Sequence, residues 1–250
     1  MKDNAIVFGY HPRVIGRFPT VRAGVVWARG VDNRTPNAAL AAAFRAEQTA
    51  ARIRLASTPL AELPSIAAWR RTFSAFGVSP TKHRNAAEAL LRRLTKHGDL
   101  PEINPLVDLG NLVSIRHALP VLVVDMAHVT GRLMVAEATG HERFADLGGT
   151  DAEHPEPGEV VFVDGAGETV ARRWCWRQSA GSAAGPDTSE ALIVVEAQHG
   201  GAETDVAAAV ATLTLLLSEH LPAAMFVTAL LGPESPNFVP PAGPEAPTRI

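Results

Sequence analysis

Four small polar residues recur at intervals of three and four in one segment of the chain: Asn104, Asp108, Asn111 and Ser114. On a helix this spacing places them along one stripe, among leucine and valine side chains. Hydrogen-bonding groups in such an apolar frame favour a pocket wall or an internal network over a solvated face. The alternative of comparable weight is that Asp108 and Asn111 only cap backbone amides.

A second cluster that could carry chemistry is the run Trp174-Cys175-Trp176-Arg177-Gln178. In a strand, alternation would put Trp174, Trp176 and Gln178 on one face and Cys175 and Arg177 on the other. Aromatic rings beside an amide would suit an aromatic amino-acid pocket, with the Gly- and Ser-rich residues 179–185 as its rim. The alternative of equal weight is a strand that packs two tryptophans under a helix.

Arginine is concentrated on three predicted helices, although the whole chain carries a formal charge of −3. The clusters are Arg45, Arg52 and Arg54, then Arg70 and Arg71, then Arg84, Arg92, Arg93 and Lys96. The net charge argues against a protein that coats nucleic acid by electrostatics alone. Three consecutive helices with arginine nevertheless predict a local basic surface. At the end of the next helix, Arg116 is a candidate for a phosphate or carboxylate contact.

Several kinds of site are not indicated. The single cysteine, Cys175, excludes a disulfide framework and a multi-cysteine zinc site. The nine histidines show no metal-ligand spacing, and neither a metal nor a cofactor is expected. Ser114 has no nucleophile-elbow glycines around it, so Ser-His-Asp catalysis is not expected either. The sequence shows no secretory signal and no apolar run near the ~20 residues of a membrane span. A cytoplasmic protein is therefore expected.

The elements that position these residues are predicted from periodicity and from Gly and Pro breaks. Helices are expected over 36–57 with Thr35 as N-cap, 63–76, 85–97, 104–117 and from 203 or 204 to 220; strands over 5–9, 21–29, 121–125, 133–138, 160–163, 169–174, 192–196 and 224–231. Helices followed by a block of strands predict an α+β domain, with a mixed β-sheet packed with helices. One domain is expected over 1–232, and a Pro-rich tail over 233–250 that is extended or disordered.

Residues 100–125, LPEINPLVDLGNLVSIRHALPVLVVD, also carry a family resemblance. The run resembles the I-N-x-x-V-D-x-x-N segment, closed by Pro and Asp, in the beta subunit of bacterial phenylalanyl-tRNA synthetase. There it belongs to the editing domain, a B3/B4-type tRNA-binding domain. Trp69, Phe73 and Gly77 followed by Pro80 look like the family's entry helix. The resemblance covers about 53–217, and no other part of a synthetase is visible, so the chain looks like a free-standing relative.

The resemblance implies trans-editing, in which a wrongly attached aromatic amino acid is hydrolysed from phenylalanine tRNA. The substrate-binding residues would be Asn104, Asp108, Asn111, Ser114, Trp176 and Gln178, and the tRNA-binding residues Arg84, Arg92, Arg93 and Arg116. The partners would be tRNA and an aminoacyl ester or aromatic amino acid. Two alternatives stay open: a non-catalytic module that binds RNA, tRNA or an aromatic amino acid, and a structural or regulatory protein that has kept only the scaffold.

Two positions depart from the synthetase pattern. Leu122 stands where the family's Pro-x-His-x-x-Asp element has histidine, and Gln178 stands where a Gly-Gly-Glu element has glutamate. An amide still hydrogen-bonds a hydroxyl, but without charge. These changes concern the substrate and the catalysis rather than the fold.

Overall fold

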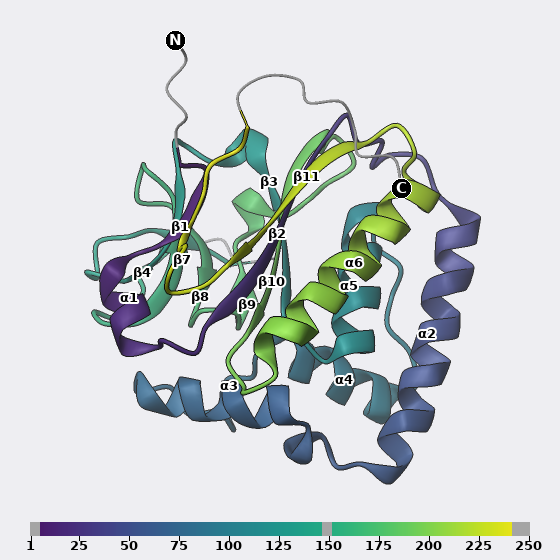
Figure 1. The fold of residues 1–250 in the computed structure, drawn as a ribbon, viewed down its shortest axis with the longest axis horizontal. Coiled ribbons are helices and arrows are strands. Elements are labelled where there is room, and N and C mark those ends of the chain that lie inside the picture. Colours follow the sequence, from purple (N-terminus) through teal and green to yellow (C-terminus); the bar gives the residue numbers. More distant parts are fainter. Residues whose placement is uncertain (1–5, 147–151, 242–250) are drawn as a thin grey trace.

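A four-stranded antiparallel sheet forms the centre of the computed structural model, which describes residues 6–146 and 152–241 (Figure 1). Its strand order is β11-β2-β10-β3, with β2 at Arg22–Arg29, β3 at Val121–Asp125, β10 at Glu190–Ala197 and β11 at Met225–Leu231. Side chains on both faces of this sheet are buried: Val26 and Ile193 on one, Val25 and Val194 on the other. Burial on both faces explains the nearly continuous apolar runs of these strands.

Helices α5 (Pro105–His117) and α6 (Ala202–His220) pack on one face of this sheet, and α2 (Ala38–Ser57) and α4 (Ala86–His97) lie on the same side and pack against α5 (Figure 1). Their leucine and alanine side chains form the first hydrophobic core with the sheet. Gly24 of β2 lets α6 approach closely, because a Cβ atom there would lie 2.2 Å from Cγ2 of Val210. The apolar side of α5 faces this core, and the N-terminal end of α5 lies at the edge of the core.

A six-stranded sheet covers the other face. Its order is β12-β1-β4-β7-β8-β9, with β1 at Phe8–Tyr10, β4 at Leu133–Glu137, β7 at Val160–Val163, β8 at Thr169–Arg172, β9 at Arg177–Gln178 and β12 at Asn237–Phe238. β1 and β4 are parallel and the other pairs antiparallel, so the sheet is mixed. Helices α1 (Pro12–Arg17) and α3 (Pro64–Ala75) complete an aromatic second core that contains Phe8, Trp69 and Trp174. The predicted α+β class with a mixed sheet is confirmed.

Two predicted helix starts are confirmed by their caps, and one is wrong. Asn85 accepts a hydrogen bond from the backbone N–H of Glu88 at 3.0 Å, and Asn104 caps α5 in the same way. Helix α2 is capped by Asn37, which accepts from the N–H of Leu40 at 2.9 Å, and not by Thr35. The Thr35 hydroxyl and backbone N–H both donate to Asp32, so Thr35 belongs to the preceding turn and not to the helix start.

Between β4 and β7 the chain contains a short two-stranded sheet, β5 (Phe144–Ala145) with β6 (Ala152–Glu153). Residues 147–151 lie outside the described residues. Short 3₁₀ turns, η1 (Leu60–Glu62), η2 (Met126–His128) and η3 (Ala180–Ser182), join other elements. Within the predicted tail, β12 pairs with β1 and buries Phe238, while residues 242–250 lie outside the described residues.

Candidate functional site

The polar stripe on α5 is largely an internal network. Asn104 accepts from the N–H of Val107 at 3.0 Å and donates to the carbonyl of Ala184 at 2.9 Å. Asp108 accepts from the N–H of Ile103 at 2.9 Å, and burial raises the pKa of its carboxyl group above the ordinary value. Both side chains therefore hold the start of the helix.

Ser114 and Asn111 differ from each other. The buried Ser114 hydroxyl donates to the carbonyl of Leu119 at 2.7 Å, which closes the C-terminal end of α5. Asn111 is partly buried, and its side chain has no hydrogen-bond partner within residues 6–146 and 152–241. Of the four stripe residues, Asn111 is thus the one whose polar group is free for a ligand.

Asn104 and Asp108 also line a groove of about 490 Å³ between the starts of α2 and α5. Asn33, Asn37, Arg34 and Arg45 are among its other lining residues. Asn111, Ser114, Trp176 and Gln178 do not line it. Of the six predicted substrate-binding residues, only Asn104 and Asp108 therefore share this groove.

The Trp-Cys-Trp segment is a turn, and the predicted strand alternation through Trp174, Trp176 and Gln178 is wrong. Arg173 and Trp174 both have left-handed backbone, with φ of 44° and 62°. Such a conformation costs a non-glycine residue free energy, so surrounding contacts must hold it. The Trp174 ring is buried in the second core, where its Nε1–H donates to Glu196 at 2.8 Å. The reversal at this turn places Trp176 outside the core.

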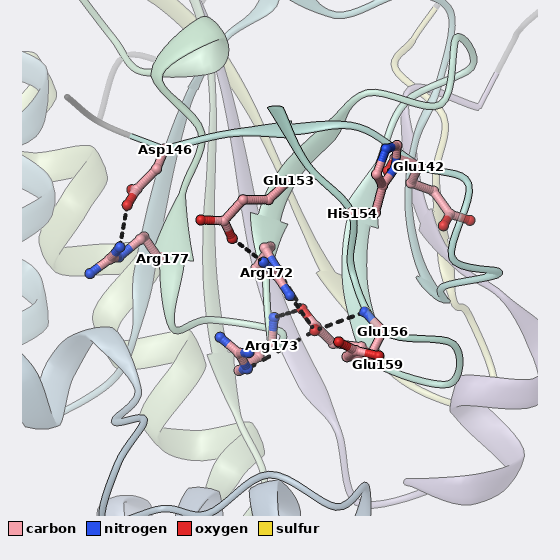
Figure 2. Close-up of polar contacts among 9 residues, drawn as sticks. All are labelled: Glu142, Asp146, Glu153, His154, Glu156, Glu159, Arg172, Arg173 and Arg177. Carbon is pink, nitrogen blue, oxygen red and sulfur yellow. Dashed lines mark hydrogen bonds and ion pairs between the residues drawn. The ribbon is translucent and has the colours of Figure 1, made fainter. Parts of the chain in front are cut away.

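A buried carboxylate, Glu159, fixes the other side of this turn, as Figure 2 shows. It accepts from Nε and Nη2 of Arg172 at 3.1 and 3.0 Å, and from the backbone N–H of Arg173 at 2.9 Å. Arg172 also donates to Glu153 at 2.5 Å, which ties the β5–β6 segment to β8. Glu159 and Glu196 together offset the cost of the two left-handed residues.

The partly buried Trp176 lies among cationic and aromatic groups. The guanidinium carbons of Arg173 and Arg177 lie 4.4 and 4.5 Å from the Trp176 ring centroid. The His83 ring meets the same indole edge-on at 4.7 Å between centroids. Burial and the nearby Arg173 lower the pKa of His83. Cation–π contact holds both guanidinium groups in place and leaves N–H donors at their edges.

Gln178 uses its amide in a way that the sequence did not indicate. Its Nε2 donates to the carbonyl oxygens of Val123 at 2.7 Å and Ser182 at 3.1 Å. Both amide hydrogens are thereby occupied, which links β9 to β3 and to the 180–182 turn. Oε1 has no partner in the part of the chain that the structure describes, so only an acceptor remains available to a ligand.

We expect Gln178→Glu to destabilise the protein at pH 7 by about 2–3 kcal/mol, because two donors are lost and a carboxylate then faces two carbonyl oxygens. Urea unfolding at pH 7 and pH 5 measures the effect, and the loss should shrink at the lower pH as the new carboxyl group takes up a proton. Gln178→Met, which loses the donors without adding a charge, should cost less at pH 7. Equal stability of the wild type and Gln178→Glu at pH 7 would contradict this interpretation.

One buried carboxylate also organises the predicted RNA-binding arginines of α4. Glu88 is 1% exposed, and its Oε1 lies 2.7 Å from Arg70, 2.8 Å from Arg92 and 3.8 Å from Arg84. One negative charge therefore holds three positive ones, which leaves an excess of about two charges at the surface. The N–H of Ala86 donates to the carbonyl of Cys175 at 2.8 Å, so this cluster and the Trp176 turn are joined directly.

The two remaining predicted RNA-binding residues lie differently. Arg93 is exposed on α4 and has no ion-pair partner among residues 6–146 and 152–241. Arg116 belongs to a second cluster, where its Nε donates to the buried Glu47 at 2.7 Å. Glu47, Glu88 and Arg173 were not predicted from the sequence. The Arg-x-x-Trp-Arg order around Trp176 was a signal for the last of these, but nothing local distinguishes the two glutamates from surface residues.

Among the residues that the structure describes, no group of three or more His, Cys, Asp and Glu side chains is arranged to hold a metal ion. Over the same residues, none of the helices combines the length and the hydrophobicity that crossing a membrane requires.

Comparison with known proteins identifies the family. Residues 68–212 match the B3/4 domain family, which is more than half of the chain, so the chain belongs to that family. The resemblance predicted from residues 100–125 is thereby confirmed. No curated protein matches the chain. Seventeen chains of solved structures do match. One is an N-terminal fragment of the phenylalanyl-tRNA synthetase beta-subunit from Pyrococcus horikoshii, with 13% identity and a TM-score of 0.44 over 88% of this chain. The match covers 50% of that fragment.

Proposed function

We propose that this B3/4-domain protein removes a wrongly attached amino acid from a tRNA in trans, by hydrolysis of the aminoacyl ester. By family resemblance the substrate is an aromatic amino acid on phenylalanine tRNA. The observation that carries the proposal is the direct link between two regions. The Ala86–Cys175 hydrogen bond joins the arginine cluster of α4 to the turn that leads into Gln178. The proposed RNA-binding surface and the acceptor group of Gln178 then lie on two neighbouring segments that this hydrogen bond joins.

The RNA end would bind through charge. Exposed Arg93, together with Arg84 and Arg92 around Glu88, offers guanidinium donors on one segment. Arg173 and Arg177 on Trp176 offer further donors on the neighbouring segment, although each also pairs with a carboxylate, Glu159 and Asp146 respectively. Guanidinium groups suit phosphate oxygens because two parallel N–H bonds reach one anion. Acting on aminoacyl-tRNA, the protein would work in the cytoplasm.

Hydrolysis of an aminoacyl ester requires few catalytic groups from the protein. An aminoacyl ester is already activated, so a positioned water and a polarised carbonyl are sufficient. The water oxygen adds to the ester carbonyl carbon, the ester C–O bond breaks, and the terminal ribose oxygen of the tRNA leaves as a hydroxyl after taking a proton. Gln178 Oε1 and the Asn111 amide are the uncommitted polar groups that this proposal assigns to the amino-acid pocket.

A second candidate, a non-catalytic module that binds tRNA or an aromatic amino acid, is favoured by a specific observation. Leu122 occupies the position of the family's histidine, and Gln178 replaces its glutamate. Neither residue can act as a general base near neutral pH. The two candidates differ in turnover, not in binding.

The test is deacylation of purified tRNAs that carry tyrosine, phenylalanine or a non-aromatic amino acid. We expect turnover of at least one aromatic ester. We also expect Arg93→Gln to weaken tRNA binding several-fold and to lower the salt slope by about one. Arg132→Gln, which removes an exposed charge in the β3–β4 connection, is the matched control and should change neither.

Asn111→Ala tests whether Asn111 acts in the amino-acid pocket or only in the stability of the fold. Since Asn111 has no partner among the described residues, its loss should leave the melting curve unchanged and reduce turnover. Tight tRNA binding with no turnover of any ester would favour the non-catalytic module. Absence of turnover, together with absence of binding to both tRNA and a free aromatic amino acid, would refute both candidates.

A further inference from the structure

A second groove, whose lining does not include Gln178, lies on the helical side of the central sheet. Its volume is about 770 Å³, and it opens between the C-terminal half of α2, the start of α3, the end of α5 and the start of α6. Its polar lining comes from arginine, histidine, serine and threonine, with one acidic residue, Asp205. A groove with this lining favours an anionic ligand.

Two arginines in this groove are held by one buried carboxylate. Glu47 accepts from Nη2 of Arg54 at 2.8 Å and from Nε of Arg116 at 2.7 Å. Glu47 is buried behind them, whereas the Arg54 and Arg116 side chains are 47% and 40% exposed. Each guanidinium has five N–H donors, so both retain donors for a ligand after binding Glu47.

The start of α6 closes the opposite side of the groove with backbone and imidazole groups. Gly200 and Gly201 precede the first turn of this 19-residue helix, which also carries Glu203 and Asp205. The N–H of Ala202 donates to the carbonyl of His199 at 3.0 Å, and the neighbouring amide groups at a helix start have no intrahelical partners. His199 also lines the groove with a side chain that is only 8% exposed. Its Nε2 lies 2.7 Å from Asp205, and its Nδ1 is buried without a hydrogen-bond partner in the described part of the chain. Such an orphan ring nitrogen is a second, independent sign that a polar ligand is missing here.

We propose that this groove binds a phosphate group, held by Arg54 and Arg116 on one side and by the Gly200-Gly201 start of α6 and His199 on the other. A helix start and a pair of guanidinium groups are the two commonest protein devices for this anion. The inference rests on the proposed function in one respect: the phosphate is assigned to the backbone of a bound RNA. A free nucleotide presents the same chemistry and is separated from RNA by the experiment.

Gly200 permits a sharp test. A Cβ atom at Gly200 would have no neighbour within 4 Å, and the residue is not left-handed, so a side chain fits without strain. Gly200→Asp adds a carboxylate that repels phosphate, while a negative charge at a helix start does not destabilise the helix. Gly200→Asn is the matched control, with the same shape and no charge. Binding of inorganic phosphate, AMP and a single-stranded RNA oligonucleotide is measured by calorimetry for all three proteins.

We expect wild type and Gly200→Asn to bind phosphate and RNA, and Gly200→Asp to bind both at least ten-fold more weakly with an unchanged melting temperature. Arg116→Gln should lower the salt slope of RNA binding by about one. A difference between the variants for AMP and phosphate but not for RNA would assign the site to a free nucleotide. Equal binding by the Asp and Asn variants for every probe would overturn the inference. Because no ester is hydrolysed in these measurements, their outcome is independent of whether the protein is a deacylase.

Discussion

Replacement of Glu196 by glutamine is expected to remove the contribution of this carboxyl group to the pH dependence of stability between pH 4.5 and about 7. Glu196 projects from β10 into the second core, where it accepts from the Tyr10 hydroxyl at 2.5 Å and from Trp174 Nε1 at 2.8 Å. Burial raises the pKa of Glu196 from 4.5 to about 7, although both hydrogen bonds act in the opposite direction. The carboxyl group therefore stays protonated in the folded protein at pH values where the unfolded chain has lost the proton.

The direction of the change in stability with pH follows from the number of protons bound by the folded and unfolded states. Below pH 4.5 the group is protonated in both states, and its contribution to stability is fully present. As pH rises to about 7, the folded protein binds more protons than the unfolded chain, so the free energy of unfolding falls. The total change is roughly 3 kcal/mol, since one pKa unit corresponds to about 1.4 kcal/mol. Above this range both states are ionised and the loss levels off.

Glutamine cannot ionise, but its amide oxygen can still accept from Tyr10 and Trp174. Urea unfolding of the wild type and of Glu196→Gln at several pH values gives the slope of the free energy of unfolding against pH. Glu190→Gln, at the partly exposed start of the same strand, is the control and should keep the wild-type slope. The interpretation fails if Glu196→Gln retains that slope as well.

The elements that the sequence predicted well are those whose signals are local. Helices α4 and α5 begin within one residue of the predicted starts because Asn85 and Asn104 supply cap and boundary together. Strands β3 and β7 match because short valine-rich runs lie between Pro, Gly and Asp residues. The aromatic second core was not predictable in the same way, since its members come from both ends of the chain.

The turn at Arg173 and Trp174 shows why part of the candidate site escaped prediction. Alternating aromatic residues are typical of a strand, and neither residue favours left-handed backbone. The conformation is imposed by Glu159 and Glu196, which come from β-strand regions on either side of the turn in sequence. The periodicity of a sequence segment carries no information about such long-range contacts. The same holds for Gln178, whose donors are taken by the carbonyl of Val123, 55 residues earlier.

The two buried glutamates escaped prediction for a related reason. A glutamate among arginines on an amphipathic helix is typical of a solvated face. Glu47 and Glu88 are buried because guanidinium groups from other elements cover them: Arg116 of α5 for Glu47 and Arg70 of α3 for Glu88. The arginine clusters were predictable from their positions on consecutive predicted helices. The carboxylates that fix them were not.

Glu88→Gln is expected to cost about 3 kcal/mol of stability, among the largest effects of a single substitution in this protein. Removing one partner of a buried ion pair leaves uncompensated charge, and here three guanidinium groups lose the same carboxylate. Equilibrium urea unfolding measures the change. Glu62→Gln makes the same charge change at an exposed residue of η1 and should stay within about 0.5 kcal/mol of wild type.

The exposure of the arginine side chains also predicts how strongly each of them interacts with Glu88. Arg70 and Arg92 lie at nearly equal distances from Glu88, 2.7 and 2.8 Å, but their side chains are 25% and 44% exposed. Water screens the more exposed pair more strongly, so distance alone does not decide the interaction energy. Double-mutant cycles of Glu88→Gln with Arg70→Gln and with Arg92→Gln should give about 1–2 kcal/mol for the first pair and less than about 1 kcal/mol for the second. A larger coupling to Arg92 would mean that the helical i,i+4 pair, and not the contact between α3 and α4, holds the carboxylate in place.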